Sequence, residues 1–422
     1  MEATRIRLAE GVHLTYLPAR KFKTSLLSAQ FVTPLRRETA GANALLAAVL
    51  RRGTVSCPDM GALSAKMDNL YDASIDYTVR KKGENQCVGF VASFIDDRYA
   101  PDGERLLEPA AALLGELICD PVTYHGRFVP EYFESEKTNL LEAIRSLIND
   151  KRDWADSRLL RALCDGEAYA VPRLGDEETV DKLQALKVYT QYRDLISTAP
   201  LEIIYSGSAE LERVKQALAA AFATLPREEV RVISTAAPHV CRESVQHVED
   251  VLDVTQGKLG MGFSCGSDDM PALLMGNTLF GGSSNSKLFL NVREKLSLCY
   301  YASSSYARSK KILTVSSGIE PKDYDRTLEE ILHQLRQVQQ GQWEPWELEG
   351  ARSTALNSLR SVGDSQSALE NFYMSRAAVD QQETPEELMQ SLSAVTPERI
   401  CAAAQSIRLD TVYFLCGKEA AQ

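Results

Sequence analysis

The histidines and cysteines of this chain are the side chains best suited to metal binding, and their spacing forms no complete metal motif. No two histidines stand at the i, i+4 spacing that places both imidazoles on one face of a helix, and the zinc-binding motif H-x-x-E-H is absent. His239 and Cys241 alternate, so on a strand they would share one face and supply half of a metal site. The alternative is that both are ordinary polar linker residues. The five histidines are His13, His125, His239, His247 and His333.

Motifs of nucleophilic catalysis and of phosphate binding are also absent from the sequence. The chain has no G-x-S-x-G, and its glycine-rich segment Phe280–Lys287 lacks the G-x-x-x-x-G-K-[ST] spacing that cradles phosphates. The nine cysteines are an odd number, are widely scattered and include no C-x-x-C pair, so a disulfide framework is not expected. Cysteines in apolar surroundings, such as Cys119 and Cys416, are predicted to be buried thiols that behave as small apolar residues.

The composition is that of an acidic globular protein. Of the 422 residues, 44% are hydrophobic and 25% are charged, and 47 basic against 58 acidic residues give a net charge of −11. Nucleic acid is not expected as a partner because phosphate neutralisation requires clustered Lys and Arg, and basic runs such as Arg80–Lys82 are short. The sequence begins with no secretory signal pattern and has no run of 18 apolar residues, so we expect a cytoplasmic protein with no membrane partner.

The same order of elements occurs twice along the chain. A helix, a polar break and a strand ending in glycine are predicted at residues 183–207 and again at 392–417, and the two glycines are 417 − 207 = 210 residues apart. Each half also opens with a strand followed by an Ala- and Leu-rich helix. These pairs are Ser28–Pro34 with Ala42–Arg52, and Leu259–Cys265 with Met270–Phe280. A separation of half the chain indicates a duplicated domain.

The remaining predicted elements indicate the fold class. Strands at 87–94 and 312–319 and long helices at 108–118, 131–148 and 324–339 follow within the halves. Strands grouped before long helices favour an α+β fold of two homologous domains of about 200 residues, each a mostly antiparallel sheet covered by helices. The mixed charge and the proline content of residues 226–246 are typical of an exposed linker. We therefore predict an N-terminal domain at 1–225 and a C-terminal domain at 247–422.

Two segments of the first half carry a resemblance to a known family. They are Ala42–Thr54, an alanine-rich helix closed by Arg-Gly-Thr, and Phe133–Ile144. They resemble the pitrilysin/insulinase family of zinc peptidases, including its processing-peptidase branch, whose first helix carries H-x-x-E-H: two histidine zinc ligands and a glutamate base. Those positions fall on Ala44, Ala47 and Ala48. Because a methyl group can neither coordinate zinc nor accept a proton, the resemblance implies a degenerate motif with no catalytic residue in this chain.

The family has a further zinc ligand, a glutamate on a later helix, and it matches Glu142, with Glu136 matching an earlier acid. Glu142 is thus the residual position of a family zinc ligand, at 142 − 48 = 94 residues from Ala48, a longer gap than is usual in the family. The helical periodicity points Glu142 nearly opposite to the apolar stripe, which favours a solvated glutamate paired with Arg145. The stripe consists of Leu140, Leu141, Ile144, Leu147 and Ile148.

The second half contains a longer match to the family. Residues 279–301 resemble the signature L-G-G-G-x-x-S-R-L-F-x-x-V-R-E-K-x-G-L-A-Y, with Lys287 in place of arginine and Ser297 in place of glycine. In the family, the later arginine and the tyrosine bind the substrate backbone in a peptide chamber that paired units close like a clamshell. They match Arg293 and Tyr300, so the resemblance implies a substrate-binding role for both. The alternatives are an intradomain ion pair for Arg293 and a core or rim position for Tyr300.

The chain lacks the zinc ligands of the family but retains Arg293 and Tyr300, and we consider three functional hypotheses. The first is the non-catalytic, substrate-binding subunit of a heterodimeric metallopeptidase, with no cofactor in this chain and zinc held by a homologous H-x-x-E-H partner. The second is a catalytically inactive scaffold or peptide-binding protein with the same fold. The third, and the least favoured, is an active zinc peptidase whose ligands are recruited from His125 or His239.

Overall fold

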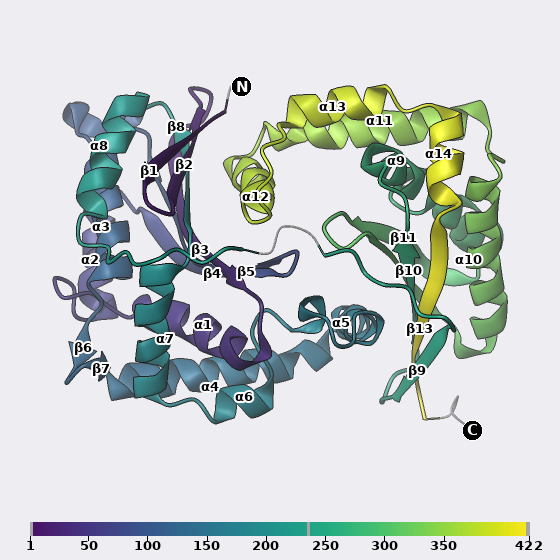
Figure 1. Cartoon of the computed structure of the whole chain (residues 1–422), viewed down its shortest axis with the longest axis horizontal. Helices are drawn as coiled ribbons and strands as arrows, with labels where there is room; N and C mark the ends of the chain where they lie inside the picture. The colour runs from purple at the N-terminus through teal and green to yellow at the C-terminus, as the bar shows by residue number, and fades with distance from the viewer. Residues whose placement is uncertain (1–2, 234–236, 419–422) are drawn as a thin grey trace. The chain divides into compact units, whose positions relative to one another are not determined.

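The computed structural model describes residues 3–233 and 237–418, which form two compact units (Figure 1). Unit 1 comprises Met1–Arg145, Val171–Thr235 and Gly363–Gln382, and unit 2 comprises Ser146–Ala170, Ala236–Val362 and Glu383–Gln422.

The elements of unit 1 are the strands β1 (Thr4–Ala9), β2 (Val12–Pro18), β3 (Thr24–Pro34), β4 (Ser74–Lys82), β5 (Asn85–Ile95), β6 (Thr123–Tyr124), β7 (Arg127–Phe128) and β8 (Leu201–Gly207), and the helices α1 (Arg37–Leu50), α2 (Met60–Asp68), α3 (Leu107–Cys119), α4 (Pro130–Ser146), α6 (Glu177–Asp181), α7 (Ala185–Thr198), α8 (Leu211–Ala221) and α12 (Gln366–Ala377). The elements of unit 2 are the strands β9 (Gln246–Val251), β10 (Gly257–Cys265), β11 (Cys299–Ala307), β12 (Ile312–Ile319) and β13 (Ile407–Cys416), the helices α5 (Lys151–Leu163), α9 (Met270–Phe280), α10 (Tyr324–Gln339), α11 (Pro345–Val362), α13 (Pro385–Ser393) and α14 (Pro397–Ala404), and a π-helical segment (Leu288–Lys295).

The predicted α+β class is confirmed, and so are the elements on which it was based. The bounds of β12, α9 and α10 agree with the sequence prediction residue for residue. These segments have clear periodicity and clear ends: α9, for example, begins after Asp269, whose side chain accepts from the backbone N–H of Ala272, and has proline in its first turn.

Both units contain a sheet with the same strand order. The sheet of unit 1 runs β1-β2-β8-β3-β5-β4, and the sheet of unit 2 runs β9-β13-β10-β12-β11. Once β1 is set aside, every strand of one sheet has a counterpart in the other. Among the described strands, the parallel pairs are β2 with β8 and β9 with β13, at equivalent places in the two sheets. The duplication inferred from the sequence is therefore present in the topology of the two units.

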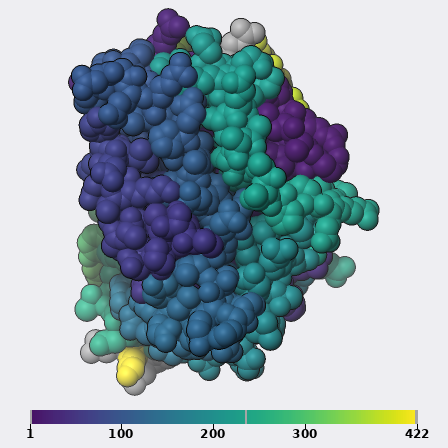
Figure 2. All heavy atoms as spheres, turned by 90° about the vertical axis from the view of Figure 1, so that its left-hand side faces the viewer, coloured from purple at the N-terminus to yellow at the C-terminus, as the bar shows by residue number. Residues whose placement is uncertain are grey.

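Side chains alternate along β3, so they point to both faces of the unit 1 sheet, and different helices cover these two faces. One set of β3 side chains enters the apolar core with α1 and α3, and α3 (blue) lies beside α8 (teal) in Figure 2. On the other face, Ser28 Oγ and Gln30 Nε2 donate to Oε1 of Glu370 on α12 at 2.9 and 2.7 Å. Glu370 is 1% exposed and also accepts from Arg80 at 2.6 Å. The core-facing residues of β3 include Leu27, Ala29 and Phe31.

Each unit contains one helix from the other half of the sequence. α12 belongs to unit 1 and packs on β8 and β3, whereas α5 belongs to unit 2 and packs on β10 and β13. Glycines on β10 admit α5, since a Cβ at Gly262 would lie 2.8 Å from Leu163 Cδ2, and one at Gly260 would lie 3.2 Å from Leu159 Cδ2. The compact units therefore differ from the predicted continuous domains at 1–225 and 247–422 by the exchanged segments 146–170 and 363–382. Within the predicted linker, residues 226–233 and 237–245 form no helix or strand.

Within residues 3–233 and 237–418, no helix combines the length and the apolar composition required to cross a membrane.

Candidate functional site

Three alanines of α1 stand at the positions where the family has its zinc ligands and base. Ala44, Ala47 and Ala48 are 2%, 0% and 7% exposed, and α1 contacts both β4 and β5. Their side chains offer no nitrogen, oxygen or sulfur atom, so these positions do not fit a zinc ion. What the alanines provide is close packing of α1 on the sheet and space above its other face.

A cavity of about 730 Å³ lies over Ala44 and Ala48 within unit 1. This volume is in the usual range for sites that bind small molecules or short peptide segments. α4 closes one side of the cavity with Glu136 and Ala143, and β4 closes another. The other lining residues are Tyr77, Thr78, Val79, Arg80, Lys81, Lys82, Asn139, Leu140, Arg173, Leu174 and Asn371.

Glu142, the residual family position, does not contribute to this cavity. Its side chain is exposed, while the next residue of α4, Ala143, lines the cavity. Arg145, the expected partner of Glu142, donates instead to Glu177 Oε1 from Nε at 2.8 Å and from Nη2 at 2.6 Å. A ligand of a metal held at positions 44 and 48 has to line the same cavity, so the relevant residue of α4 is a further alanine.

Glu136 is the acidic residue that does line the cavity, and it already has partners. It is 9% exposed, its Oε1 accepts from Arg52 Nη1 at 2.9 Å, and its Oε2 accepts from Asn139 Nδ2 at 3.1 Å. The sequence contained a signal for this arrangement that the motif match missed. Counting from Glu136, the helical steps i+3 and i+7 lead to Asn139 and Ala143, not to Glu142.

The strand that borders the cavity, β4, is the last strand of its sheet and pairs with β5 alone in the described sheet. Its lining residues end in the basic run Arg80–Lys82, and Tyr77 on the same strand is 47% exposed. Edge strands present unpaired backbone N–H and C=O groups, so an extended chain can be added beside them.

Arg293 and Tyr300 both lie in unit 2, where Tyr300 is exposed and Arg293 is half-buried with its side chain 40% exposed. The Arg293 guanidinium lies over the Phe289 ring at 4.7 Å, and its Nη1 is 3.6 Å from Glu294 Oε1. Tyr300 begins β11 after Cys299, is 56% exposed and donates from its hydroxyl to Glu320 Oε1 at 2.7 Å. This hydrogen bond to Glu320 raises the pKa of Tyr300. Neither side chain belongs to a core, and both can be reached by a ligand.

Two of the departures from the family signature, at Lys287 and Ser297, have local explanations. Lys287 is 5% exposed, and its Nζ donates to Oε1 of Glu347 on α11 at 3.1 Å, so it joins the π-helical segment to that helix. Ser297 has a φ of 50°, the left-handed region that favours glycine, which is the residue of the family at this position.

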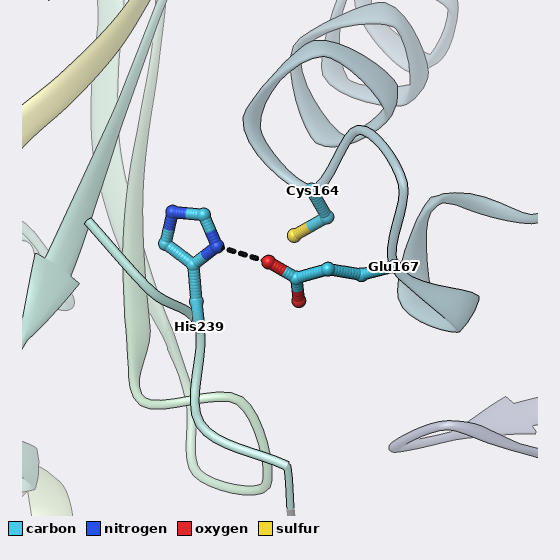
Figure 3. Close-up of side chains that lie close together, drawn as sticks. All are labelled: Cys164, Glu167 and His239. Atoms are coloured by element: carbon cyan, nitrogen blue, oxygen red, sulfur yellow. Dashed lines mark hydrogen bonds and ion pairs between the residues drawn. The ribbon is translucent and has the colours of Figure 1, made fainter. Parts of the chain in front are cut away.

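A second group of donor atoms gathers in unit 2, at Cys164, Glu167 and His239 (Figure 3). One donor atom of each lies within 4.8 Å of the others, and His239 Nδ1 is 2.5 Å from Glu167 Oε1. Cys164 and Glu167 follow α5, whereas His239 lies in residues 237–242, which form no strand. Of the two interpretations of His239 and Cys241, the half-site on a strand is wrong in its geometry, because His239 faces residues from a distant part of the chain.

Charged neighbours balance the acids of this group. Lys310, 1% exposed, forms an ion pair with Glu167, and Arg242 Nη1 donates to Asp410 Oδ1 at 2.6 Å. The other ring nitrogen of His239 is 3.2 Å from Asp410 Oδ2. Two cations and two carboxylates thus surround the imidazole, and a metal held by Glu167 would lie close to the Lys310 ammonium. We interpret the group as a structural network of unit 2.

Several known proteins are similar to this chain. The family described as Peptidase M16 inactive domain matches residues 182–355. The protein named "Probable inactive metalloprotease YmfF" from Bacillus subtilis (strain 168) is 33% identical over 417 residues, which cover 97% of each sequence. A conserved protein from Enterococcus faecalis V583 has a TM-score of 0.88 at 28% identity, over 99% of both chains. The peptidase M16 inactive domain from Pseudomonas fluorescens has a TM-score of 0.81 at 17% identity, over 99% of this chain and 98% of that one, which shows a shared fold.

A duplicated α+β fold with alanines at the zinc positions defines a class of metallopeptidase-like proteins without the metal ligands. The chain belongs to the M16 family of peptidases, and it is an inactive member of that family. The resemblance found in the sequence is thereby confirmed.

Proposed function

We propose that this inactive M16 chain is the non-catalytic, substrate-binding subunit of a heterodimeric zinc peptidase that acts on peptides. In this proposal a homologous chain with H-x-x-E-H holds the zinc ion and carries out hydrolysis. The observation that carries the proposal is the cavity of unit 1, which remains open beside the edge strand β4 although the residues beneath it are alanines. A cavity without catalytic groups is suited to binding a substrate.

The accessible side chains of Arg293 and Tyr300 support the same proposal. A guanidinium offers five N–H donors, and the contacts of Arg293 with Phe289 and Glu294 leave its side chain 40% exposed. A peptide carbonyl or carboxylate could therefore bind to Arg293 without unfolding of the π-helical segment.

The first test is to purify the chain from its native cell under gentle conditions and to identify the proteins that elute with it in stoichiometric amounts. A homologous chain with H-x-x-E-H is the expected companion. Elution of the chain alone, or with a large unrelated assembly, would contradict the heterodimer.

The second test examines Arg293 in the purified complex. Arg293→Ala is expected to lower kcat/KM for peptide cleavage about tenfold or more, because a hydrogen bond to a charged group contributes about 1.5–3 kcal/mol. Arg326→Ala, which removes an exposed arginine of α10, is the control and should leave cleavage unchanged. Equal turnover of the two variants would remove Arg293 from the substrate-binding site.

A specific observation favours a second candidate, an inactive scaffold or peptide-binding protein. The Tyr300 hydroxyl already donates to Glu320, and the Arg293 guanidinium already stacks on Phe289, so both groups have local roles. Under this candidate, no peptidase chain co-purifies, and the isolated protein still binds unstructured peptides or a large assembly.

A further inference from the structure

We infer that the cavity of unit 1 binds a carboxylate group of an acidic peptide. This inference rests on the proposed function, because it names the class of peptide that the cavity would receive. It is opposite in sign to the expectation from net charge, since the chain as a whole carries −11 while the wall formed by β4 is basic.

The cationic side chains of the cavity differ in how their charge is compensated. Arg80 donates to the buried carboxylate of Glu370 at 2.6 Å, so its charge is neutralised by α12. Lys82 Nζ donates to Asn371 Oδ1 at 2.6 Å and to Ser375 Oγ at 2.8 Å, and both acceptors are uncharged. These hydrogen bonds orient the Lys82 ammonium but supply no opposite charge.

Burial makes the charge of Lys82 more costly. Loss of hydration, the largest influence, lowers the pKa of Lys82, and the nearby Arg80 acts in the same direction. An anion in the cavity would offset this cost, because an opposite charge favours the protonated amine.

Arg173 supplies a second positive group to the same cavity. Its Nη1 donates to the backbone oxygen of Val79 on β4 at 3.2 Å, an acceptor without formal charge. That hydrogen bond uses one of the five N–H donors of the guanidinium, which is suited to binding a carboxylate through two parallel hydrogen bonds.

The acid of the cavity does not cancel these charges. Glu136 is engaged by Arg52 at 2.9 Å, and Arg52 is not a lining residue. The lining therefore keeps an excess of positive charge at Lys82 and Arg173. The edge of β4 beside them can pair with an extended backbone, which favours a peptide as the carrier of the carboxylate.

The test uses the full chain and fluorescein-labelled nonapeptides of identical length. One peptide has Glu at alternate positions, a second has Gln there and a third has Lys. Fluorescence anisotropy at low salt should show the Glu peptide binding about tenfold or more tightly than the Gln peptide, and the Lys peptide binding weakest. The preference should shrink as the ionic strength is raised, because salt screens charge pairs.

The source of the carboxylate is distinguished by amidating the C-terminus. If amidation of the Gln peptide abolishes its binding, the terminal carboxylate occupies the cavity. If amidation of the Glu peptide leaves its binding unchanged, the side-chain carboxylates do so. The second result supports the inference, and the first overturns it, because a terminal carboxylate is common to all three peptides and gives no preference for an acidic one.

Two double variants locate the binding site. Lys82→Gln with Arg173→Gln should weaken the Glu peptide about tenfold or more and change the Gln peptide less than about twofold. Lys187→Gln with Arg193→Gln removes the same number of charges from exposed positions of α7 and should change neither peptide. A Lys82→Glu variant should shift the preference toward the Lys peptide.

The inference and the proposed function fail in different ways. Equal affinities for the Glu, Gln and Lys peptides overturn the acidic preference and leave peptide binding intact. A preference that the Lys82/Arg173 and Lys187/Arg193 variants reduce equally overturns the assignment to the cavity. Absence of binding by any of the three peptides contradicts peptide binding itself, and the inference with it.

Discussion

Ala143 shows how much one residue step along a helix decides about a binding site. Successive side chains on a helix are turned by about 100°, so neighbours face different surroundings. Glu142 does not line the cavity, whereas Ala143 lines it together with Ala44 and Ala48. A family match that is shifted by one position therefore changes the conclusion from a residual ligand to no ligand.

This geometry predicts which substitutions would restore metal binding. The triple variant Ala44→His/Ala48→His/Ala143→Glu would have three ligand side chains in one cavity. It is expected to bind zinc about tenfold or more tightly than the double variant without Ala143→Glu. Titration with Co²⁺, followed by its visible absorption and then by zinc competition, measures the difference.

The native Glu142 provides the internal control for that experiment. The two-histidine variant retains Glu142, so it should bind zinc weakly if this glutamate stays in solvent. Equal affinities of the two variants would show that Glu142 reaches the metal.

The pKa of Asp410 makes the stability of the protein depend on pH. Burial by itself would raise the pKa of Asp410, but hydrogen bonds from the Arg242 backbone, Thr411, His239 and the Arg242 side chain outweigh burial and lower the pKa below the ordinary 3.8. A lowered folded-state pKa gives stability that is present above the unfolded-state pKa and is lost as the pH falls through the folded-state value.

Asp410→Asn should therefore lower the free energy of unfolding by about 1–3 kcal/mol at pH 7, through loss of a charged hydrogen bond. The difference from the unmodified protein should stay constant above about pH 5 and shrink below about pH 4. Urea unfolding at pH 7, 5, 4 and 3 measures it. Asp165→Asn, at an exposed position, should change stability by less than about 0.5 kcal/mol, and a difference for Asp410→Asn that does not depend on pH would contradict the assignment.

At the scale of elements, β10 shows a conflict between strand propensity and packing. Glycine is a poor strand residue, yet Gly260 and Gly262 occur in the centre of the unit 2 sheet. Their missing side chains allow Leu159 and Leu163 of α5 to approach the strand. The composition of the strand is thus set by the helix that covers it.

Because packing against α5 opposes strand propensity at Gly262, Gly262→Val is expected to lower the free energy of unfolding rather than raise it. Strand propensity alone would favour valine, but a Cβ at this position lies 2.8 Å from Leu163 Cδ2, so the variant should be destabilised by about 1–3 kcal/mol. Chemical denaturation measures the change. Ser305→Val, on the exposed side of β11, should stay within about 0.5 kcal/mol. Stabilisation by Gly262→Val would mean that α5 does not pack closely on β10.

At the scale of the whole molecule, the exchange of α5 and α12 makes each unit depend on both halves of the sequence. Without α12, the unit 1 sheet would lose the carboxylate that accepts from Ser28, Gln30 and Arg80. A half-buried cation and two buried donors would then lose this acceptor, at a cost of several kcal/mol. The chain is duplicated in topology but not divisible at its middle.

A half-chain therefore should not fold on its own. Residues 1–225 are expected to unfold without a cooperative transition and to bind a hydrophobic dye, and a synthetic peptide of residues 363–382 should restore cooperative unfolding. Circular dichroism and dye fluorescence provide the readouts. The same peptide with Glu370→Ala is the matched control and should restore less. Cooperative folding of residues 1–225 alone would support the predicted continuous domain instead.

The sequence by itself determined the elements, the duplication and the family. These features depend on local periodicity, on capping residues and on a long signature, all of which can be recognised along the chain: β12, α9 and α10 were placed residue for residue. The loss of the zinc ligands could also be recognised in the sequence, because alanine at positions 44, 47 and 48 has no side-chain donor atom in any fold.

Only the tertiary structure decided which distant residues meet. The partner of Arg80 on α12, the contact of His239 with Glu167 and the choice of Ala143 over Glu142 all depend on side-chain directions or on contacts across more than 70 residues. The exchange of α5 and α12 is of the same kind, since an amphipathic helix carries no local record of which sheet it will cover. The positive cavity in an acidic chain follows for the same reason, because net charge is a sum over the sequence and a binding site is a place in the fold.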